Sequence, residues 1–118
     1  MWLKPGFYPL SLDEAREDFI DNAGRFANSW LPIMTDGGGE FLVVDCADEA
    51  CPILLYQADD EPERVYDSLE LMVKTLSECV ARKIFFIDED GRYEVDDDSE
   101  AAVTSQLNPN SEYWTDFL

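Results

Sequence analysis

The sequence contains no histidine, and this absence removes several classes of enzyme at once. Ser-His-Asp and Cys-His nucleophilic sites both require an imidazole, and histidine is the commonest general base near neutral pH. Carboxylate pairs can still perform acid–base chemistry, as in glycoside hydrolases. With 27 acidic residues, however, pairs arise by chance and none stands out. We therefore expect no enzymatic activity, no catalytic residues and no cofactor.

Basic residues are also scarce: 8 Lys and Arg stand against 27 Asp and Glu, which gives a net charge of −19. Nucleic acid is a poor direct partner for such a chain, because binding it depends on Lys and Arg that neutralise phosphates. Anionic membrane surfaces are disfavoured for the same reason. The field of this protein would instead attract a basic protein or a multivalent cation. The same charge also keeps a protein soluble without any partner, so charge alone leaves both interpretations open.

Long apolar runs are missing as well. No stretch of 18 apolar residues exists, and the first ten residues lack the apolar core of a signal peptide. The cysteines are three in number, Cys46, Cys51 and Cys79, and we expect reduced thiols in a cytoplasmic protein. A zinc site would need all three thiols and a carboxylate, so we interpret these cysteines as buried or incidental and expect no metal.

What the chain does contain is enough core material for one domain spanning residues 1–118, with 46% hydrophobic and 13% aromatic residues. Its first element is a helix. The S-x-x-E pattern at Ser11–Glu14 is that of a capping box and predicts a helix that begins at Leu12. Apolar residues then recur at spacings of three and four, which predicts that the helix ends near Asn28.

Residues 30–45, "WLPIMTDGGGEFLVVD", predict two strands, 30–34 and 40–45, around three consecutive glycines. A glycine-rich phosphate loop leads from a strand into a helix, and a Lys followed by Ser or Thr accompanies it. Here a strand comes next and that pair is absent, so we interpret the glycines as a tight turn with positive φ. A further strand over 52–57 and a charged loop over 58–64 come after it.

The clearest predicted helix covers residues 66–83, with Asp67 and Glu70 as a second capping box. A hairpin over 83–95 follows, with Asp90-Gly91 at its turn. The segment "DEDG" faintly resembles a calcium loop, but strands flank it, so we interpret it as a hairpin turn. A short helix within 96–107 and an aromatic tail complete an α+β fold with an antiparallel sheet packed against helices. The apolar face predicted for the long helix consists of Leu69, Met72, Val73, Leu76 and Val80.

Four stretches in this order resemble the SUKH superfamily, bacterial immunity proteins related to a fungal cell-wall-assembly regulator. They are "FYPLSLDEA", "WLPIMTDGGGEFLVVD", "VYDSLELMVKTL" and the closing "NPNSEYW". Members of that superfamily usually begin with a helix and a strand upstream of the first matched stretch. The resemblance therefore implies an N-terminally shortened member, or one that borrows a sheet edge from a partner or a second copy, as in a homodimer.

The resemblance implies a protein that binds and neutralises a cognate toxin, commonly a nuclease, a deaminase or another intracellular poison. The charge agrees with this, because a nuclease presents a basic surface to its substrate and complementary fields accelerate association. Two alternatives from other classes remain. The first is a non-catalytic regulatory scaffold module. The second is an acidic inhibitor that mimics DNA and targets a DNA-binding protein.

Candidate contacts with such a partner are two groups of acidic residues, interpreted as loops, and two aromatic residues near the C-terminus. Solvated loops without a partner, and aromatic residues packed on the sheet, are the alternatives. Trp30, Leu31, Pro32, Phe41 and Val43 we assign to the fold. The candidate contacts are Asp59, Asp60, Glu61, Glu63, Asp96, Asp97, Asp98, Glu100, Tyr113 and Trp114.

Overall fold

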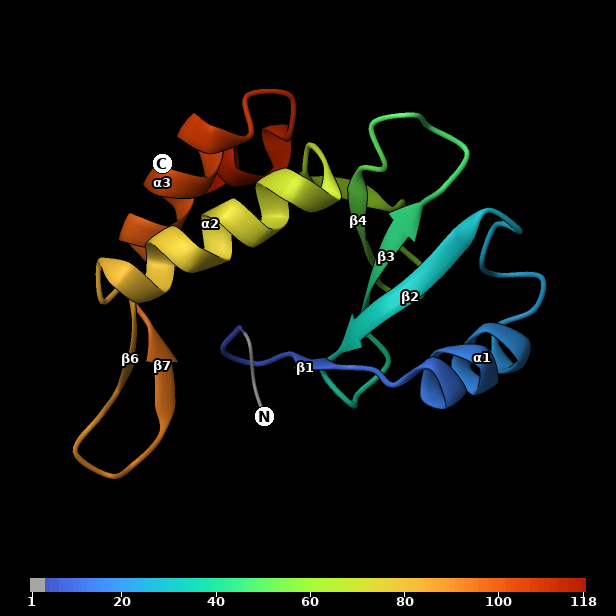
Figure 1. Cartoon of the computed structure of the whole chain (residues 1–118), viewed down its shortest axis with the longest axis horizontal. Coiled ribbons are helices and arrows are strands. Elements are labelled where there is room, and N and C mark those ends of the chain that lie inside the picture. The colour runs from blue at the N-terminus through green and yellow to red at the C-terminus, as the bar shows by residue number, and fades with distance from the viewer. Residues whose placement is uncertain (1–3) are drawn as a thin grey trace.

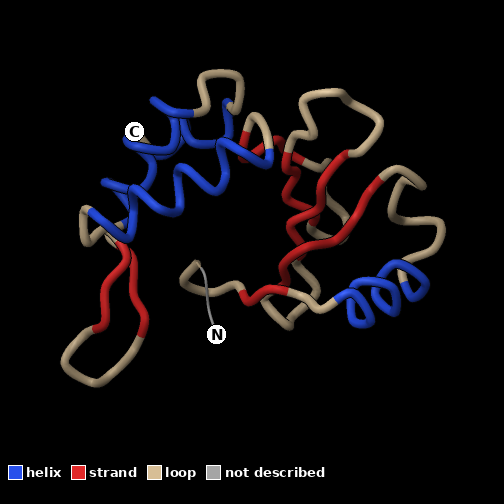
Figure 2. Tube along the Cα trace, viewed as in Figure 1, coloured by secondary structure: helices blue, strands red, loops and turns tan. Residues whose placement is uncertain are grey.

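A five-stranded antiparallel sheet lies at the centre of the computed structural model, which describes residues 4–118 (Figures 1 and 2). Its strand order, β1-β2-β3-β4-β5, is also the order along the chain, and every neighbouring pair is antiparallel. The strands are β1 (Tyr8–Pro9), β2 (Trp30–Thr35), β3 (Phe41–Asp45), β4 (Ile53–Tyr56) and β5 (Glu63–Tyr66). Such a meander needs only local connections, which suits a short chain.

Helices cover both faces of the sheet. Helix α1 (Leu12–Asp21) covers one face, while α2 (Leu69–Ala81), α3 (Asp97–Leu107) and the 3₁₀ helix η1 (Glu112–Phe117) cover the other (Figure 1). Strands β6 (Phe85–Ile87) and β7 (Tyr93–Val95) form a separate hairpin beyond the end of α2. The predicted α+β class, with an antiparallel sheet packed against helices, is confirmed.

Strand β3 shows why the sheet is buried on both sides. Phe41 and Val43 belong to the cluster under α1, whereas Leu42 and Val44 belong to the cluster under α2 and α3. Successive side chains of a strand point to opposite faces, so four consecutive apolar residues all find a core. All four are buried.

The capping box of α1 is confirmed, but the predicted end of that helix is wrong. Ser11 and Glu14 exchange side-chain and backbone hydrogen bonds, yet the helix ends at Asp21 rather than near Asn28. Gly24 follows with φ of +87°, a conformation that breaks the helix and turns the chain. Phe26 is buried in the loop after it, with its ring edge-on to Phe41. The spacing of Phe26 continued the helical pattern of the sequence, but its burial comes from packing against the sheet and not from a helix.

The triple glycine is a turn between β2 and β3, as predicted. Gly37 and Gly39 have φ of +81° and +107°. The amides of Gly38 and Glu40 donate to Asp36 Oδ1 at 2.8 and 3.0 Å. Partial burial raises the pKa of the Asp36 carboxyl, but these donated hydrogen bonds outweigh it and hold the pKa below its usual value.

The predicted charged loop at 58–64 is too long, because its last residues pair in β5. Glu63 lies opposite Leu55 and Arg64 lies opposite Leu54.

The start of α2 also differs from the prediction. Its N-cap is Ser68, whose side chain accepts a hydrogen bond from the amide of Leu71, so the predicted capping box at Asp67 is wrong.

Helix α2 buries a different face from the one that its apolar residues predict. Met72, Thr75 and Cys79 are buried, whereas Val73 and Val80 remain 55% and 54% exposed. The helix is rotated because Thr75 is drawn inside by a hydrogen bond from Asn108. Part of its apolar surface therefore faces solvent.

No helix within residues 4–118 is long and apolar enough to cross a membrane.

Candidate partner-binding surface

The first group of predicted contacts lies at the connection from β4 to β5. Asp59, Asp60 and Glu61 are all exposed in this turn, and Glu63 is exposed at the start of β5. No ion pair involves these four side chains among those found in residues 4–118. The fold therefore leaves this group accessible, and its role in partner binding stays a prediction.

The second group is not a loop but the start of α3. Asp96 is the N-cap and accepts a hydrogen bond from the Ser99 hydroxyl at 2.9 Å. Asp97 and Asp98 are exposed in the first turn. Negative side chains are favourable there, because the helix N-terminus carries a partial positive charge. These aspartates thus support the helix as well as the surface charge.

Glu100 is buried, and this removes it from the accessible contacts. Its carboxylate pairs with Lys4 Nζ at 2.5 Å, and the two side chains are only 7% and 11% exposed. The same Nζ lies 5.7 Å from the ring centre of Phe85 and 5.6 Å from that of Trp114. One helical turn after the N-cap, α3 turns its side chains toward the core, which is why this glutamate differs from its neighbours.

Trp114 is buried too, so the packing alternative holds for it. Its indole Nε1 donates a 2.6 Å hydrogen bond to the carbonyl of Val65 in β5. Tyr113 is half-buried, with its ring centre 5.1 Å from that of Trp114. Trp114 therefore anchors η1 to the sheet, whereas Tyr113 keeps some surface that a partner can reach.

A cavity of about 340 Å³ lies between the sheet, α3 and η1. Its lining is mostly apolar, and two of its three charged residues, Lys4 and Glu100, neutralise each other. Tyr66 lines it as well, and its buried hydroxyl has no hydrogen-bond partner within residues 4–118. Burial, and secondarily the charge of Glu100, raise the pKa of Tyr66 well above its usual value. This phenol is therefore neutral near pH 7.

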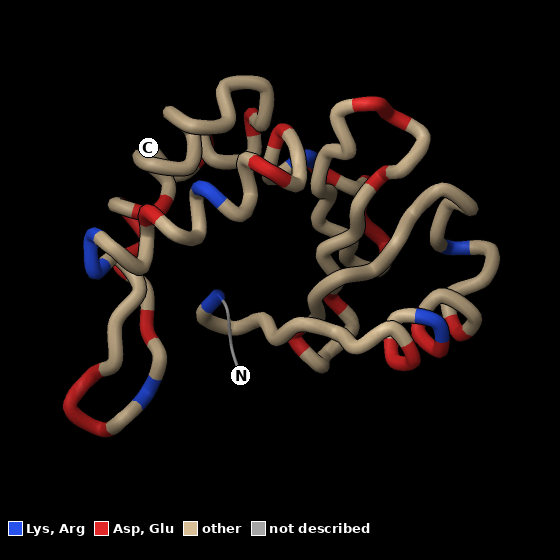
Figure 3. Tube along the Cα trace, viewed as in Figure 1, with Lys and Arg blue, Asp and Glu red and all other residues tan. Residues whose placement is uncertain are grey.

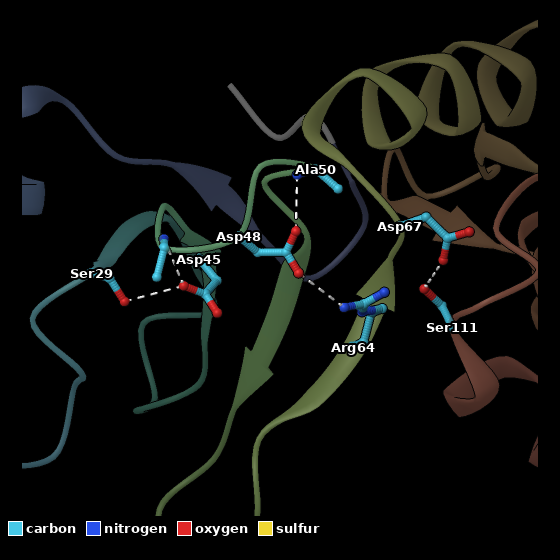
Figure 4. A network of polar contacts seen from close by, with 8 residues as sticks. Ser29, Asp45, Asp48, Ala50, Arg64, Asp67 and Ser111 are labelled. Carbon is cyan, nitrogen blue, oxygen red and sulfur yellow. Dashed lines mark hydrogen bonds and ion pairs between the residues drawn. The ribbon is translucent and has the colours of Figure 1, made fainter.

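A buried cluster of polar side chains, Asp67, Thr75, Asn108 and Ser111, joins β5 and α2 to the segment before η1; we name it the polar seam. The Asp67 carboxylate accepts from the Ser111 hydroxyl at 2.6 Å (Figure 4). The Asn108 side chain accepts from the Asp67 amide at 3.0 Å and donates to Thr75 Oγ1 at 2.9 Å. Sequence reasoning missed this cluster, because its hydrogen bonds join residues that are 33 to 44 positions apart.

Acidic residues in the loop between β3 and β4 are used locally. Asp48 Oδ1 accepts from the amide of Ala50 at 2.9 Å, and its carboxylate lies 3.6 Å from the Arg64 guanidinium (Figure 4). Asp45 accepts from the Ser29 hydroxyl at 3.1 Å. Some of the acidic side chains thus stabilise loops through local contacts and are not free to contact a partner.

The β6–β7 hairpin carries exposed apolar residues that sequence reasoning did not single out. Phe86 is 40% exposed and Ile87 is 65% exposed. At the turn, Asp88 Oδ1 accepts from the amides of Asp90 and Arg92, both at 2.9 Å, so the hairpin interpretation of "DEDG" is confirmed. The "FFI" run in this segment was the available signal, but it equally describes a buried strand.

The thiols differ in accessibility. Cys46 is exposed and Cys51 is partly exposed, whereas Cys79 is buried. Burial raises the pKa of the Cys79 thiol to about 11, so this thiol is neutral and unreactive near neutral pH. No group of three or more cysteine or acidic side chains in the described part of the chain is placed to hold a metal ion.

Comparison with known proteins gives one match. A sequence model of the SMI1 / KNR4 family (SUKH-1) matches residues 2–75. No curated protein and no solved structure matches the chain. The matched region contains α1, β1 to β5 and the first half of α2, while the hairpin, α3 and η1 lie beyond it. Because more than half of the residues match and the fold agrees with the resemblance, the chain belongs to the SMI1 / KNR4 family (SUKH-1).

Proposed function

We propose that this protein is an immunity protein, which binds and neutralises a basic toxin in the cytoplasm of the bacterium that carries it. Family membership supports a non-catalytic binding role of this kind. The observation that carries the proposal is the net charge of −19, together with the exposed acidic groups at the β4–β5 turn and the start of α3. A nuclease domain, whose surface must attract phosphates, is the toxin class that best complements this charge.

The charge acts mainly on the rate of capture. Complementary fields raise association from about 10⁵–10⁶ M⁻¹s⁻¹ toward 10⁸–10⁹ M⁻¹s⁻¹ at low salt. An incoming toxin must be bound before it finds its substrate, so a fast association rate is useful in itself. Slow dissociation requires buried apolar contacts in addition, because exposed ion pairs add little affinity.

The test is co-expression of this protein with the product of the gene beside its own, which the proposal requires to be a toxin. We expect the toxin alone to stop growth of a bacterial host, and growth to be restored when both proteins are made. Co-purification on a gel-filtration column should show a complex. Failure to protect, with both proteins soluble and present, would overturn the proposal.

The same experiment separates the two alternative functions. A stable complex with a signalling or housekeeping protein, and none with the neighbouring toxin, would indicate a regulatory scaffold. A DNA-binding partner that is released by added duplex DNA would indicate an inhibitor that mimics DNA. Both partners are distinguished from a toxin because their expression alone does not stop growth.

A further inference from the structure

The β6–β7 hairpin projects from the end of the molecule (Figure 1). Within residues 4–118, its two strands pair only with each other and not with the five-stranded sheet. It lies outside residues 2–75, the region that the family model matches. The hairpin is therefore not among the features by which the family is recognised in this chain. A projecting element with two open edges is accessible to a partner from several sides.

One apolar face of the hairpin begins in the core and continues into solvent. Phe85, at its base, is buried with Cys79 and Val103. Ile87 lies on the same face of the ribbon, because side chains two residues apart in a strand point the same way. At this distance from the base the core no longer covers it, and it is 65% exposed. Phe86 presents a second apolar surface, 40% exposed, on the opposite face.

Acidic residues surround these two side chains. Glu89 and Asp90 are exposed at the tip, and Figure 3 shows the tip as an acidic segment with one basic residue beside it. The start of α3 lies at the base of the same ribbon. From residue 85 to residue 98 the only basic residue is Arg92, and the acidic residues are Asp88, Glu89, Asp90, Glu94, Asp96, Asp97 and Asp98.

We propose that this hairpin is the arm that enters a basic cleft of the partner, with Phe86 and Ile87, on the two faces of the ribbon, buried against opposite walls of the cleft and the tip carboxylates paired with Lys and Arg at its floor. The inference rests on the proposed function and names the surface that performs it. A second copy of the chain is a poor occupant, since two chains of charge −19 repel each other. A nuclease substrate groove has the required charge, and an arm in that groove would exclude the nucleic acid directly.

The decisive variant is the double substitution Phe86→Ser with Ile87→Ser. Its matched control is Leu12→Ser with Ile20→Ser on α1, which removes apolar side chains that are 84% and 59% exposed from the opposite end of the molecule (Figure 1). The probe is the toxin identified by the co-expression test, inactivated by one catalytic substitution. Binding is measured by surface plasmon resonance, and folding of every variant is checked from its melting temperature.

We expect the hairpin variant to weaken binding by at least about tenfold, through faster dissociation, and the α1 variant to bind like the wild type. Tight binding by the hairpin variant, with the wild type also binding, would overturn the arm and leave the proposed function standing. Equal weakening in both variants would also overturn it, because the loss would not belong to the hairpin. No binding by the wild type would overturn the proposed function and this inference with it.

A charge reversal tests the second half of the inference. Glu89→Lys at the tip and Glu17→Lys on α1 change the net charge equally, and both glutamates are exposed. We expect the tip substitution to slow association severalfold at low salt, and the α1 substitution to have a much smaller effect. Equal rates for the two variants would show that only the total charge matters and would remove the tip from the contact.

Discussion

The carboxylates of this protein fall into two populations, the buried and the exposed, and the net charge counts them alike. Asp67 and Glu100 lie inside, and each has specific partners: two hydrogen-bond donors for Asp67 and the Lys4 ammonium for Glu100. Asp59 and Asp60 lie outside, in a turn exposed to solvent. The net charge of −19 therefore counts together carboxylates that set the field at the surface and carboxylates that hold buried contacts.

The difference teaches which acidic residues are free to act on a partner. A buried carboxylate must keep its partners, because leaving one unpaired costs far more than the pair contributes. An exposed carboxylate is already satisfied by water and changes the field around the protein with little effect on folding. Substitutions in the two populations should therefore have opposite consequences for stability and for binding.

The largest effect is expected at the polar seam. Asp67→Ala should lower the free energy of unfolding by about 3 kcal/mol, because it leaves the buried Ser111 hydroxyl and the Asn110 amide without their acceptor. Urea denaturation measures this. Asp60→Ala, in the exposed turn, is the control and should stay within about 0.5 kcal/mol of the wild type. Similar losses in both variants would erase the distinction between the populations.

The ion pair of Lys4 and Glu100 comes next. Glu100→Gln should lower the free energy of unfolding by about 2 kcal/mol, because the Lys4 ammonium is left without its counter-ion in a site where it is only 11% exposed. Adding Lys4→Met should recover most of that loss, since the double variant buries no charge. A double-mutant cycle followed by denaturation checks it. Purely additive losses would contradict the pairing.

Asp36 sharpens the comparison because it is partly exposed and yet has partners. Asp36→Ala should cost about 1 kcal/mol at pH 7, through the two amide hydrogen bonds of the glycine turn. The pKa of Asp36 is lowered from its usual 3.8, so its contribution is complete above that value and is lost as the pH falls through the folded pKa. The difference in melting temperature between wild type and variant should thus begin to shrink as the pH falls below about 3.8 and vanish only below the folded pKa, and a constant difference would refute the assignment.

The smallest effect on stability is expected at the start of α3. Asp97→Lys with Asp98→Lys should lower stability by roughly 0.5 kcal/mol, through the helix N-terminus, while it slows association with the toxin at low salt. Asp96 is left unchanged because it caps the helix. Asp13→Lys with Glu17→Lys on α1 makes the same charge change elsewhere. Stopped-flow rates that are equal for both pairs would exclude α3 from the contact.

Local signals in the sequence predicted much of the fold. The capping box predicted the start of α1, runs of β-branched, aromatic and large apolar residues located β2 to β4, and Asp90-Gly91 marked the hairpin turn. The glycine run after Asp36 was recognised as a turn, because a strand comes directly after it. These features depend on neighbours within a few residues, and such neighbours are visible in the sequence itself.

The errors came from contacts between distant residues. The apolar pattern of α2 predicted that Val73 and Val80 are buried, but the polar seam draws Thr75 inward instead. Glu100 was grouped with the aspartates that precede it, although its partner is Lys4, 96 residues away. For Trp114 the sequence left a surface anchor and packing on the sheet both open, and the hydrogen bond to the carbonyl of Val65 in β5 agrees with packing.

The sequence by itself determined the charge, most of the elements and the family. It determined the absence of imidazole chemistry as well, since composition and local pattern need no folding to be known. Only the tertiary structure decided which carboxylates are buried and which apolar residues face solvent. The physical reason is that burial depends on which distant segments pack together, and a residue's own neighbours in the chain do not specify that. Glu100 in the core and Ile87 on the surface are the two clearest examples.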